Sequence, residues 1–375
     1  MADRRLRVLS VFGTRPEAVK MAPVVLRLQR TPDVESCVCV TAQHRQMLDQ
    51  VLNLFEIHPD YDLDLMQPDQ SLAETAAAVF LGLDPVLEQV QPDWVLVQGD
   101  TTTVAAAALL AYYRKIRVGH VEAGLRTGDK WRPFPEEINR HVAGVVADLH
   151  FAPTKWARSN LLSEGVPEEK IVVTGNPVID ALHAIIALPY EVAGGPLADL
   201  PSDRLLILVT AHRRESFGMP LENIFTALKR LAERYASQAD ILYPVHLNPN
   251  VREPAWRILG GLPNVRLVEP LDYRTMAHCL ERAHLVLTDS GGLQEEAPAL
   301  GTPVLVMREV TERPEALEAG TARLVGTDAD RIVAEASRLM DDPKAHAAMA
   351  KAANPYGDGH AAERIVDALL AASRA

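Results

Sequence analysis

Short apolar runs rich in β-branched residues alternate with amphipathic segments along most of this chain. In the first half, the apolar runs predict strands over residues 7–12, 36–41, 94–98 and 118–122. The segments between them predict helices over residues 17–29, 46–54 and 102–114. Near-continuous apolar strands separated by helices are typical of a parallel sheet that helices cover on both faces.

The same alternation restarts after residues 188–203, a stretch rich in Pro, Gly and Asp that we interpret as the interdomain linker. Further strands are predicted over residues 205–210, 241–245, 266–268, 285–288 and 304–306, and one apolar helical stripe is formed by Leu221, Ile224, Phe225, Leu228 and Leu231. The predicted fold is α/β, with two doubly wound Rossmann-like parallel-sheet domains at residues 1–187 and 188–354. Ligands of such sheets bind at the carboxyl ends of the strands, so we expect the site in the cleft between the two domains.

Composition narrows the possible partners. Lys and Arg number 38 and Asp and Glu number 50, which gives a net charge of −12. Such a chain is a poor ligand for nucleic acid or an anionic membrane surface. The three cysteines, Cys37, Cys39 and Cys279, are too few and too oddly placed for a disulfide framework or a zinc site. No secretory apolar segment follows the charged start, and the longest apolar run, residues 104–113, is too short to span a membrane. We therefore expect a cytoplasmic protein.

Four constellations carry candidate chemistry, and the first follows the first predicted strand. There Gly13 turns the chain and Pro16 suits the start of a helix. Helix N-terminal N–H groups attract anions, and Arg15 beside them can hold a phosphate, with Lys20 one turn further on. The alternative is an ordinary strand–helix turn with surface cations.

The second constellation brings acids to one sheet edge. Asp100 ends an apolar strand, Glu122 ends the next one, and Glu136 lies in a further loop after Pro135. Carboxylates gathered at one edge repel each other, so we expect one of them to have a raised pKa, as in acid–base pairs. The alternatives are that Asp100 caps a helix and that Glu136 only complements a helix dipole.

The third and fourth constellations belong to the second half. His212 and Arg213 follow its first strand and favour anion binding, and His246 ends another strand and is predicted to lie nearby. The turn Ser290-Gly291-Gly292 opens a helix, which offers backbone N–H groups to a diphosphate. Further candidates are Glu296, an acceptor for a ribose diol, and Arg313, a cation after the next strand.

Taken in this order, the constellations resemble those of the bacterial non-hydrolysing UDP-N-acetylglucosamine 2-epimerases. The matching segments are Phe12-Gly13-Thr14-Arg15-Pro16-Glu17, Gly99-Asp100-Thr101-Thr102-Thr103, His120-Val121-Glu122-Ala123-Gly124-Leu125-Arg126, His212-Arg213-Arg214-Glu215, Ser290-Gly291-Gly292-Leu293-Gln294-Glu295-Glu296 and Thr311-Glu312-Arg313-Pro314-Glu315. The resemblance runs from residue 7 to the tail at residues 354–359, although the Ser-Gly-Gly-x-Gln-Glu-Glu segment taken by itself is also similar to many nucleotide-sugar transferases.

The resemblance implies a GT-B fold whose C-terminal helix, within residues 355–375, returns to the first domain. It implies reversible conversion of UDP-N-acetylglucosamine to UDP-N-acetylmannosamine for surface polysaccharides, by a homodimer, without metal or cofactor. UDP would leave by anti elimination to 2-acetamidoglucal and add back after protonation of the other face. The implied proton-transfer residues are Asp100, Glu122 and Glu136, and the implied contacts to the leaving diphosphate are Arg15, His212, Arg313 and the 290–292 turn.

Two departures from the family pattern leave details open. Some members bind uracil with a Gln and an aromatic residue where this chain has Leu271 and Met276. Some relatives are activated by a second substrate molecule near the segment at residues 43–46 and a later Arg, but residues 66–70 of this chain contain no Arg. The rival interpretations are a glycosyltransferase, a hydrolysing epimerase and a non-enzymatic nucleotide-sugar sensor.

Overall fold

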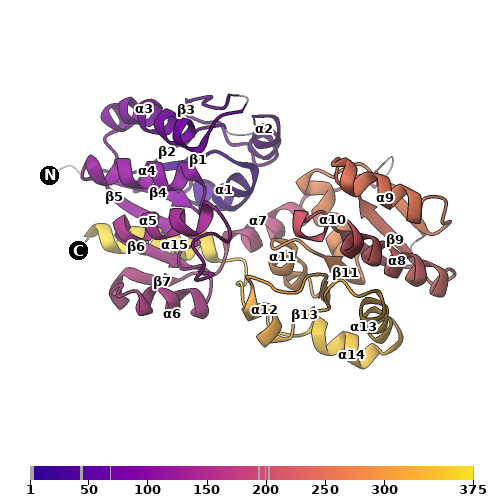
Figure 1. Ribbon diagram of the computed structural model, residues 1–375. Helices are drawn as coiled ribbons and strands as arrows, with labels where there is room; N and C mark the ends of the chain where they lie inside the picture. The colour runs from indigo at the N-terminus through magenta and orange to yellow at the C-terminus, as the bar shows by residue number, and fades with distance from the viewer. Residues whose placement is uncertain are drawn as a thin grey trace. The chain divides into compact units, whose positions relative to one another are not determined.

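The computed structural model describes residues 4–42, 45–67, 69–192, 195–198, 200–201 and 203–374. The chain forms two compact units (Figure 1). Unit 1 consists of Met1–Ala181 together with Tyr356–Ala375, and unit 2 consists of Leu182–Pro355. The chain therefore leaves unit 1 once and returns to it for its last segment.

Unit 1 is built on a seven-stranded sheet of order β3-β2-β1-β4-β5-β6-β7, in which every neighbouring pair is parallel. Its strands are β1 (Leu6–Phe12), β2 (Val34–Val40), β3 (Tyr61–Asp62), β4 (Trp94–Gln98), β5 (Arg117–Val121), β6 (Leu149–Ala152) and β7 (Ile171–Val173). Its helices are α1 (Arg15–Gln29), α2 (Arg45–Leu54), α3 (Leu72–Val90), α4 (Thr102–Tyr113), α5 (Glu136–Val146), α6 (Lys155–Ser163) and α15 (Ala361–Arg374), and α7 (Pro177–Ile186) leads into unit 2.

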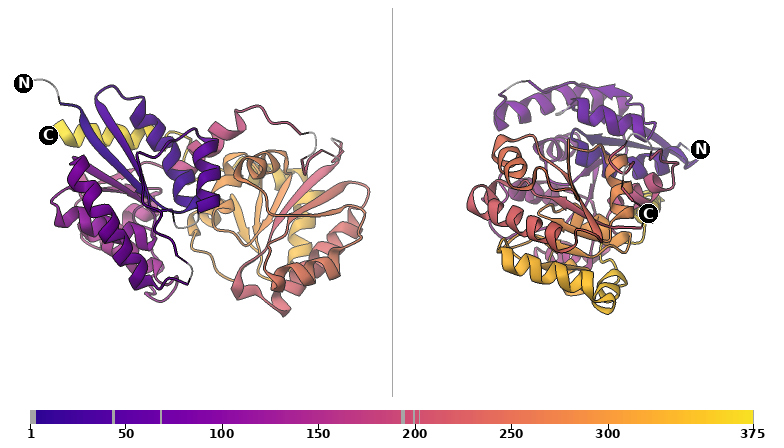
Figure 2. Two further views of the ribbon diagram at one scale, coloured as in Figure 1. Left: turned by 90° about the horizontal axis from the view of Figure 1, so that it is seen from above. Right: turned by 90° about the vertical axis from the view of Figure 1, so that its right-hand side faces the viewer.

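Helices cover both faces of this sheet. Helix α4 packs between α3 and α5, and α1 packs against α2 and α15. Strands β1 and β4 are buried on both sides, so Leu9, Val11, Val95 and Val97 are fully buried in the core. Helix α15, drawn in yellow, lies along unit 1 although it is the last segment of the chain (Figure 2). Asp180 holds its start by accepting the N–H of Ala362 at 2.8 Å.

Unit 2 repeats the architecture with a six-stranded parallel sheet of order β10-β9-β8-β11-β12-β13. Its strands are β8 (Leu205–Thr210), β9 (Ala239–Pro244), β10 (Val265–Val268), β11 (Leu285–Thr288), β12 (Val304–Val306) and β13 (Ala322–Leu324). Its further helices are α8 (Met219–Arg234), α9 (Pro249–Leu259), α10 (Tyr273–Arg282), α11 (Leu293–Ala299), α12 (Pro314–Ala319), α13 (Ala329–Asp341) and α14 (Pro343–Ala350). The predicted helical stripe, from Leu221 to Leu231, is fully buried on α8.

The prediction of two doubly wound parallel-sheet domains is confirmed, and β4, β8, β11 and β12 have the predicted bounds. Three strands end one residue before the predicted position: β2 at Val40, β5 at Val121 and β9 at Pro244. Glu122 therefore lies beyond β5 and adopts a left-handed backbone with φ 64°. The linker prediction at residues 188–203 includes Ala193, Gly194, Asp199 and Ser202, which are outside the described residues. No helix in the described part of the chain is long and apolar enough to cross a membrane.

Candidate functional site

The carboxyl edge of the unit 1 sheet begins with the turn between β1 and α1. Thr14 caps α1, Pro16 occupies its second position, and Glu17 completes a capping box with Thr14. The buried Glu17 carboxylate also accepts the N–H of Gly13 at 2.9 Å and the hydroxyl of Thr101 at 2.7 Å. Burial raises the pKa of Glu17, and the hydrogen bonds from Thr101, Gly13 and Thr14 offset only part of that rise.

Glu122 is the most heavily hydrogen-bonded of the predicted acids. Its carboxylate lies 2.5 Å from the ammonium of Lys20, and it accepts the side-chain amides of Asn176 at 3.0 Å and of Gln98. Lys20 and Glu122 are both largely shielded from solvent, with side-chain exposures of 15% and 5%. The structure therefore pairs Lys20 with a predicted catalytic acid, and Asn176 and Gln98 donate to the same carboxylate.

Asp100 is held from both its backbone and its side chain. The guanidinium of Arg140 lies 2.6 Å from its carboxylate, and the Asn139 amide donates to its backbone carbonyl at 2.9 Å. Arg140 also pairs at 2.8 Å with Glu137, whose side chain is 1% exposed. Thr101, not Asp100, caps α4, so the capping alternative for Asp100 is wrong.

Glu137 orders the loop that precedes α5. Its carboxylate accepts the backbone N–H groups of Thr127 and Gly128, both at 3.0 Å. Burial would raise the pKa of Glu137, but these two N–H groups and the Arg140 guanidinium outweigh burial, so that pKa is lowered. Glu137 was not predicted from the sequence, because the acid directly after Pro135 is Glu136, which is the predicted catalytic residue.

The remaining predicted residues of unit 1 occupy the same edge. Glu136 is the first residue of α5, and its Oε2 is buried without a hydrogen-bond partner among the described residues. Arg15 is exposed on the first turn of α1. The sequence predicted carboxylates that repel one another, but Asp100 and Glu122 are each ion-paired with a cation. At this edge burial raises the pKa of Glu17, a residue that was given no role from the sequence.

His120, two residues before Glu122, supports the turn after β4. Its Nε2 lies 2.7 Å from the carbonyl oxygen of Gly99, so this nitrogen carries the proton and donates it to that oxygen. Burial lowers the pKa of His120 to about 4, which keeps the ring neutral near pH 7. Gly99 itself has φ 81°, a conformation that favours glycine.

In unit 2, a buried carboxylate orients the predicted histidine. Asp289 follows β11, is fully buried, and accepts the backbone N–H groups of His212 at 2.5 Å and Arg213 at 2.7 Å. Its other oxygen lies 3.2 Å from His212 Nδ1. Burial would raise the pKa of Asp289, but the His212 side chain and these backbone donors outweigh it and lower that pKa. The ring of His246 stacks on that of His212 with centroids 5.6 Å apart, as the predicted proximity requires.

The turn formed by Ser290, Gly291 and Gly292 lies next to the same carboxylate, and Arg313 packs against it. A Cβ on Gly291 would be 3.2 Å from Arg313 Cζ, so glycine allows this close approach. Arg313 is fixed by Glu295 at 2.8 Å and by Glu312 at 3.3 Å.

Glu312 is also paired with Arg213 at 3.4 Å and with Arg308 at 2.7 Å. Burial would raise the pKa of Glu312, but Arg313 and Arg308 lower it to about 2. Sequence reasoning missed Glu312 and Arg308 as organisers of the predicted cations, although Glu312 stands in the quoted motif.

The remaining residues belong to the predicted ribose and uracil contacts and to the segment linked to activation. Glu296 is buried on α11, and burial and the Glu296 carboxylate raise the pKa of Tyr273 well above its ordinary value. Leu271 and Met276 are partly buried. In the segment linked to activation, Gln43, His44 and Pro68 are outside the described residues, whereas Arg45 pairs with Asp62 at 2.6 Å.

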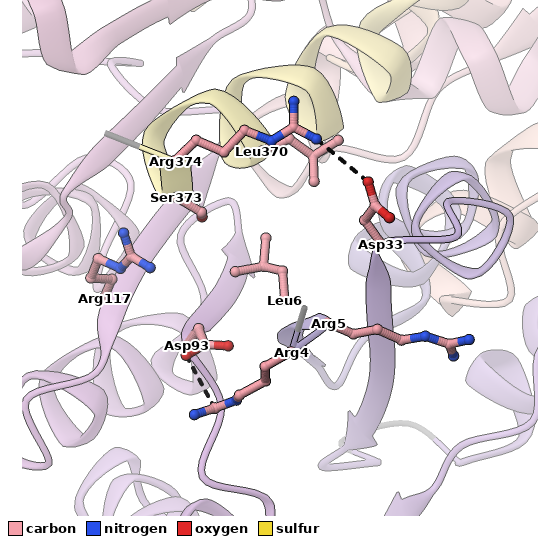
Figure 3. A pocket seen from close by; sticks show the side chains of 9 residues that line it. All are labelled: Arg4, Arg5, Leu6, Asp33, Asp93, Arg117, Leu370, Ser373 and Arg374. Atoms are coloured by element: carbon pink, nitrogen blue, oxygen red, sulfur yellow. Dashed lines mark hydrogen bonds and ion pairs between the residues drawn. The ribbon is translucent and has the colours of Figure 1, made fainter. Parts of the chain in front are cut away.

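A pocket of about 360 Å³ lies at the opposite edge of the unit 1 sheet, where β1, β4 and β5 begin (Figure 3). Two of its arginines are ion-paired, since Arg4 pairs with Asp93 at 3.2 Å and Arg374 with Asp33 at 3.4 Å. Arg117 donates to a carbonyl at the end of α15. Among the described residues, no group of three or more His, Cys, Asp or Glu is placed to hold a metal ion.

Comparison with known proteins finds similarity over the whole chain. The profile of the family described as UDP-N-acetylglucosamine 2-epimerase matches residues 26–370. A UDP-N-acetylglucosamine 2-epimerase of Salmonella typhimurium is 56% identical, covering 97% of this chain and 98% of that protein.

Two solved structures show the same similarity in three dimensions. The UDP-GlcNAc 2-epimerase from Neisseria meningitidis bound to UDP-GlcNAc has a TM-score of 0.89 and 48% identity, and covers 98% of this chain and 100% of that chain. The Methanocaldococcus jannaschii UDP-GlcNAc 2-epimerase in complex with UDP-GlcNAc and UDP has a TM-score of 0.81 and 32% identity, with the same coverage. The predicted GT-B fold class is confirmed by these neighbours.

Proposed function

This chain belongs to the UDP-N-acetylglucosamine 2-epimerase family, and we propose that it interconverts UDP-N-acetylglucosamine and UDP-N-acetylmannosamine by eliminating UDP and adding it back. It is an enzyme of the isomerase class. The observation that carries the proposal is the gathering of Asp100, Glu122 and Glu136 at one sheet edge with cationic partners for two of them.

The chemistry of C2 explains why elimination is needed. The C2 proton is not next to a carbonyl group, so its direct removal would leave an unstabilised carbanion. In an anti elimination, a base takes the C2 proton and the C–H electron pair forms the C1–C2 double bond of 2-acetamidoglucal. The C1–O bond breaks, and its electrons leave with UDP. Readdition of UDP with protonation of the opposite face of C2 by a second acid yields the epimer. The first group then loses its proton to water and the second regains one from water, which restores the starting state.

Proton transfer at two faces requires more than one acid–base group. Asp100 and Glu122 are ion-paired with Arg140 and Lys20, so both carboxylates are held in place at the sheet edge. Glu136 has a buried oxygen without a hydrogen-bond partner among the described residues, which suits a group that exchanges a proton with the sugar. We propose these three carboxylates as the proton carriers.

Departure of UDP requires donors directed at the diphosphate. We propose that the 290–292 turn, His212, Arg213 and Arg313 supply them, because their side chains are already ordered by Asp289 and Glu312. Arg15 and Lys20 add positive charge from unit 1, His246 supports His212, and Glu296 is the proposed acceptor for the ribose diol. From the family resemblance we also propose a cytoplasmic homodimer that supplies surface polysaccharide synthesis.

The test is incubation of the purified protein with UDP-N-acetylglucosamine alone in D₂O, followed by NMR. We expect a fixed mixture of two UDP-sugars with deuterium at C2 of the product. Accumulation of free UDP would indicate a hydrolysing epimerase, and no change would indicate a transferase or a sensor. Product without deuterium at C2 would refute the elimination mechanism.

A variant series then tests the three carboxylates. Asp100→Asn, Glu122→Gln and Glu136→Gln should each lower the epimerisation rate by about 100-fold or more, since general acid–base groups contribute about 10²–10⁴-fold. Glu88→Gln is the matched control, because Glu88 is an exposed acid of unit 1 with a side-chain exposure of 72%. Release of 2-acetamidoglucal by one variant would show which proton transfer it has lost.

A further inference from the structure

Glu17 is a buried carboxylate for which the proposed reaction has no use. It is 2% exposed and forms no ion pair with any described residue, so the groups that donate to its carboxyl oxygens are neutral. These donors come from two separate turns. Gly13 and Thr14 donate their N–H groups to Oε2 at 2.9 and 2.7 Å, and Thr101 donates its hydroxyl to Oε1 at 2.7 Å.

Capping of α1 does not account for this arrangement. Helix α3 carries the same capping box, in which Glu74 accepts the N–H of Ser71 at 2.8 Å. Glu74 is exposed, and its hydrogen bonds stay within its own helix turn. Glu17 differs because its second oxygen reaches the turn after β4, 84 residues away in the sequence.

The turn that Glu17 reaches is the one that carries Asp100. Two further hydrogen bonds hold this turn. His120 donates to the Gly99 carbonyl at 2.7 Å, and Asn139 donates to the Asp100 carbonyl at 2.9 Å. Glu17 accepts the hydroxyl of Thr101 and so connects the same turn to the start of α1.

Helix α1 carries the partner of the second acid, since Lys20 lies 2.5 Å from Glu122. Beneath the same two turns, the hydroxyl groups of Thr41 and Thr103 are 3.2 Å apart, and a Cβ on Gly13 would be 2.0 Å from Thr41 Oγ1. The turns after β1 and β4 are thus packed closely enough for one carboxylate to span them.

We infer that Glu17 is a positioning residue that fixes the turn carrying Asp100 relative to the helix carrying Lys20, an inference that rests on the proposed function. The carboxylate acts through geometry, not through its charge. A displacement of about 1 Å at a reacting group can lower a rate by about 100-fold, so a link between two turns of the site has a measurable effect on kcat.

The experiment compares Glu17→Gln with Glu17→Met. Gln keeps one oxygen for both N–H groups, and its NH₂ group donates to Thr101, whose hydroxyl also accepts. We expect Glu17→Gln to keep kcat within about threefold, and Glu17→Met to lower kcat by about 10- to 100-fold. The dissociation constant of UDP should change by less than about threefold in both, because its proposed diphosphate contacts are mainly in unit 2. Glu74→Met, the matched change in the α3 capping box, should leave kcat unchanged.

A second pair covers the case in which Glu17→Met does not fold. Thr101→Val removes the hydroxyl that both bridges the turns and caps α4, and Thr101→Ser keeps both contacts, so only the valine variant should lose kcat. Wild-type kcat in Glu17→Met or Thr101→Val would overturn the inference, as would a Glu17→Gln variant as slow as Glu17→Met, because charge would then be the cause. An inactive wild-type protein would instead refute the proposed function.

Discussion

The buried arginine between two acids of unit 1 offers a quantitative test. Replacing Arg140 with Met keeps an unbranched side chain of similar length but removes the partner of Asp100 at 2.6 Å and of Glu137 at 2.8 Å. Glu137 is 1% exposed, so the variant leaves a buried carboxylate with only two backbone donors. Breaking a buried pair in this way costs about 3–5 kcal/mol of unfolding free energy. For a domain of this size, that loss corresponds to a fall in Tm of about 6–20 °C.

The pH dependence of this loss follows from the lowered pKa of Glu137. A carboxyl whose pKa is lowered by folding stabilises the fold above its unfolded pKa, about 4.3, and loses that contribution as the pH falls through its folded pKa. Removing Arg140 takes away one cause of the lowering. The difference between wild type and Arg140→Met should therefore be largest at pH 7.5 and should shrink when the pH is lowered to 4.

Denaturant unfolding at the two pH values measures both quantities. Arg114→Met is the matched control, since Arg114 pairs with Asp84 at 2.6 Å but both side chains are about one-third or more exposed. Such surface pairs contribute about 0–1 kcal/mol. Equal losses in the two variants, or a loss for Arg140→Met that grows towards pH 4, would refute the reasoning.

Three further changes have defined outcomes. Gly291→Ala adds a Cβ that would be 3.2 Å from Arg313 Cζ and so displaces a proposed diphosphate contact. The dissociation constant of UDP should rise about tenfold with little change in Tm. Calorimetry that shows unchanged affinity would contradict this. Glu312→Gln should lower the free energy of unfolding by about 1–3 kcal/mol at pH 7.5. Because the pKa of Glu312 is about 2 in the folded protein, denaturation curves should show this loss decreasing below pH 4. A loss that does not change with pH would count against this prediction. Burial lowers the pKa of His120 to about 4, so the free energy of unfolding should fall by up to about 1.4 kcal/mol per pH unit as the pH is lowered from 6.5 to 4. His120→Gln should reduce this slope. An unaltered slope would exclude His120 as its source.

The alternation of apolar runs was enough to predict a parallel sheet in each domain, because strands buried on two faces consist mostly of apolar residues. Strands β3, β6, β7 and β13 were not predicted. β3 has only two residues, β6 contains the buried His150, and β7 and β13 each bury only their first residue fully. The expectation that the active site lies in the cleft between the two domains stays a prediction.

The sequence by itself determined which side chains reach the carboxyl edges of the sheets, since a residue that ends a parallel strand must lie there. It also carried the motifs that predicted the epimerase family. Only the tertiary structure decided how those side chains are paired: Lys20 with Glu122, Arg140 with Asp100, and Glu17 with Thr101. These partners are separated by 40 to 102 residues, and local pattern carries no information on contacts over such separations. The pKa of each acid depends on those contacts and on burial, so the sequence named the groups and the fold set their chemistry.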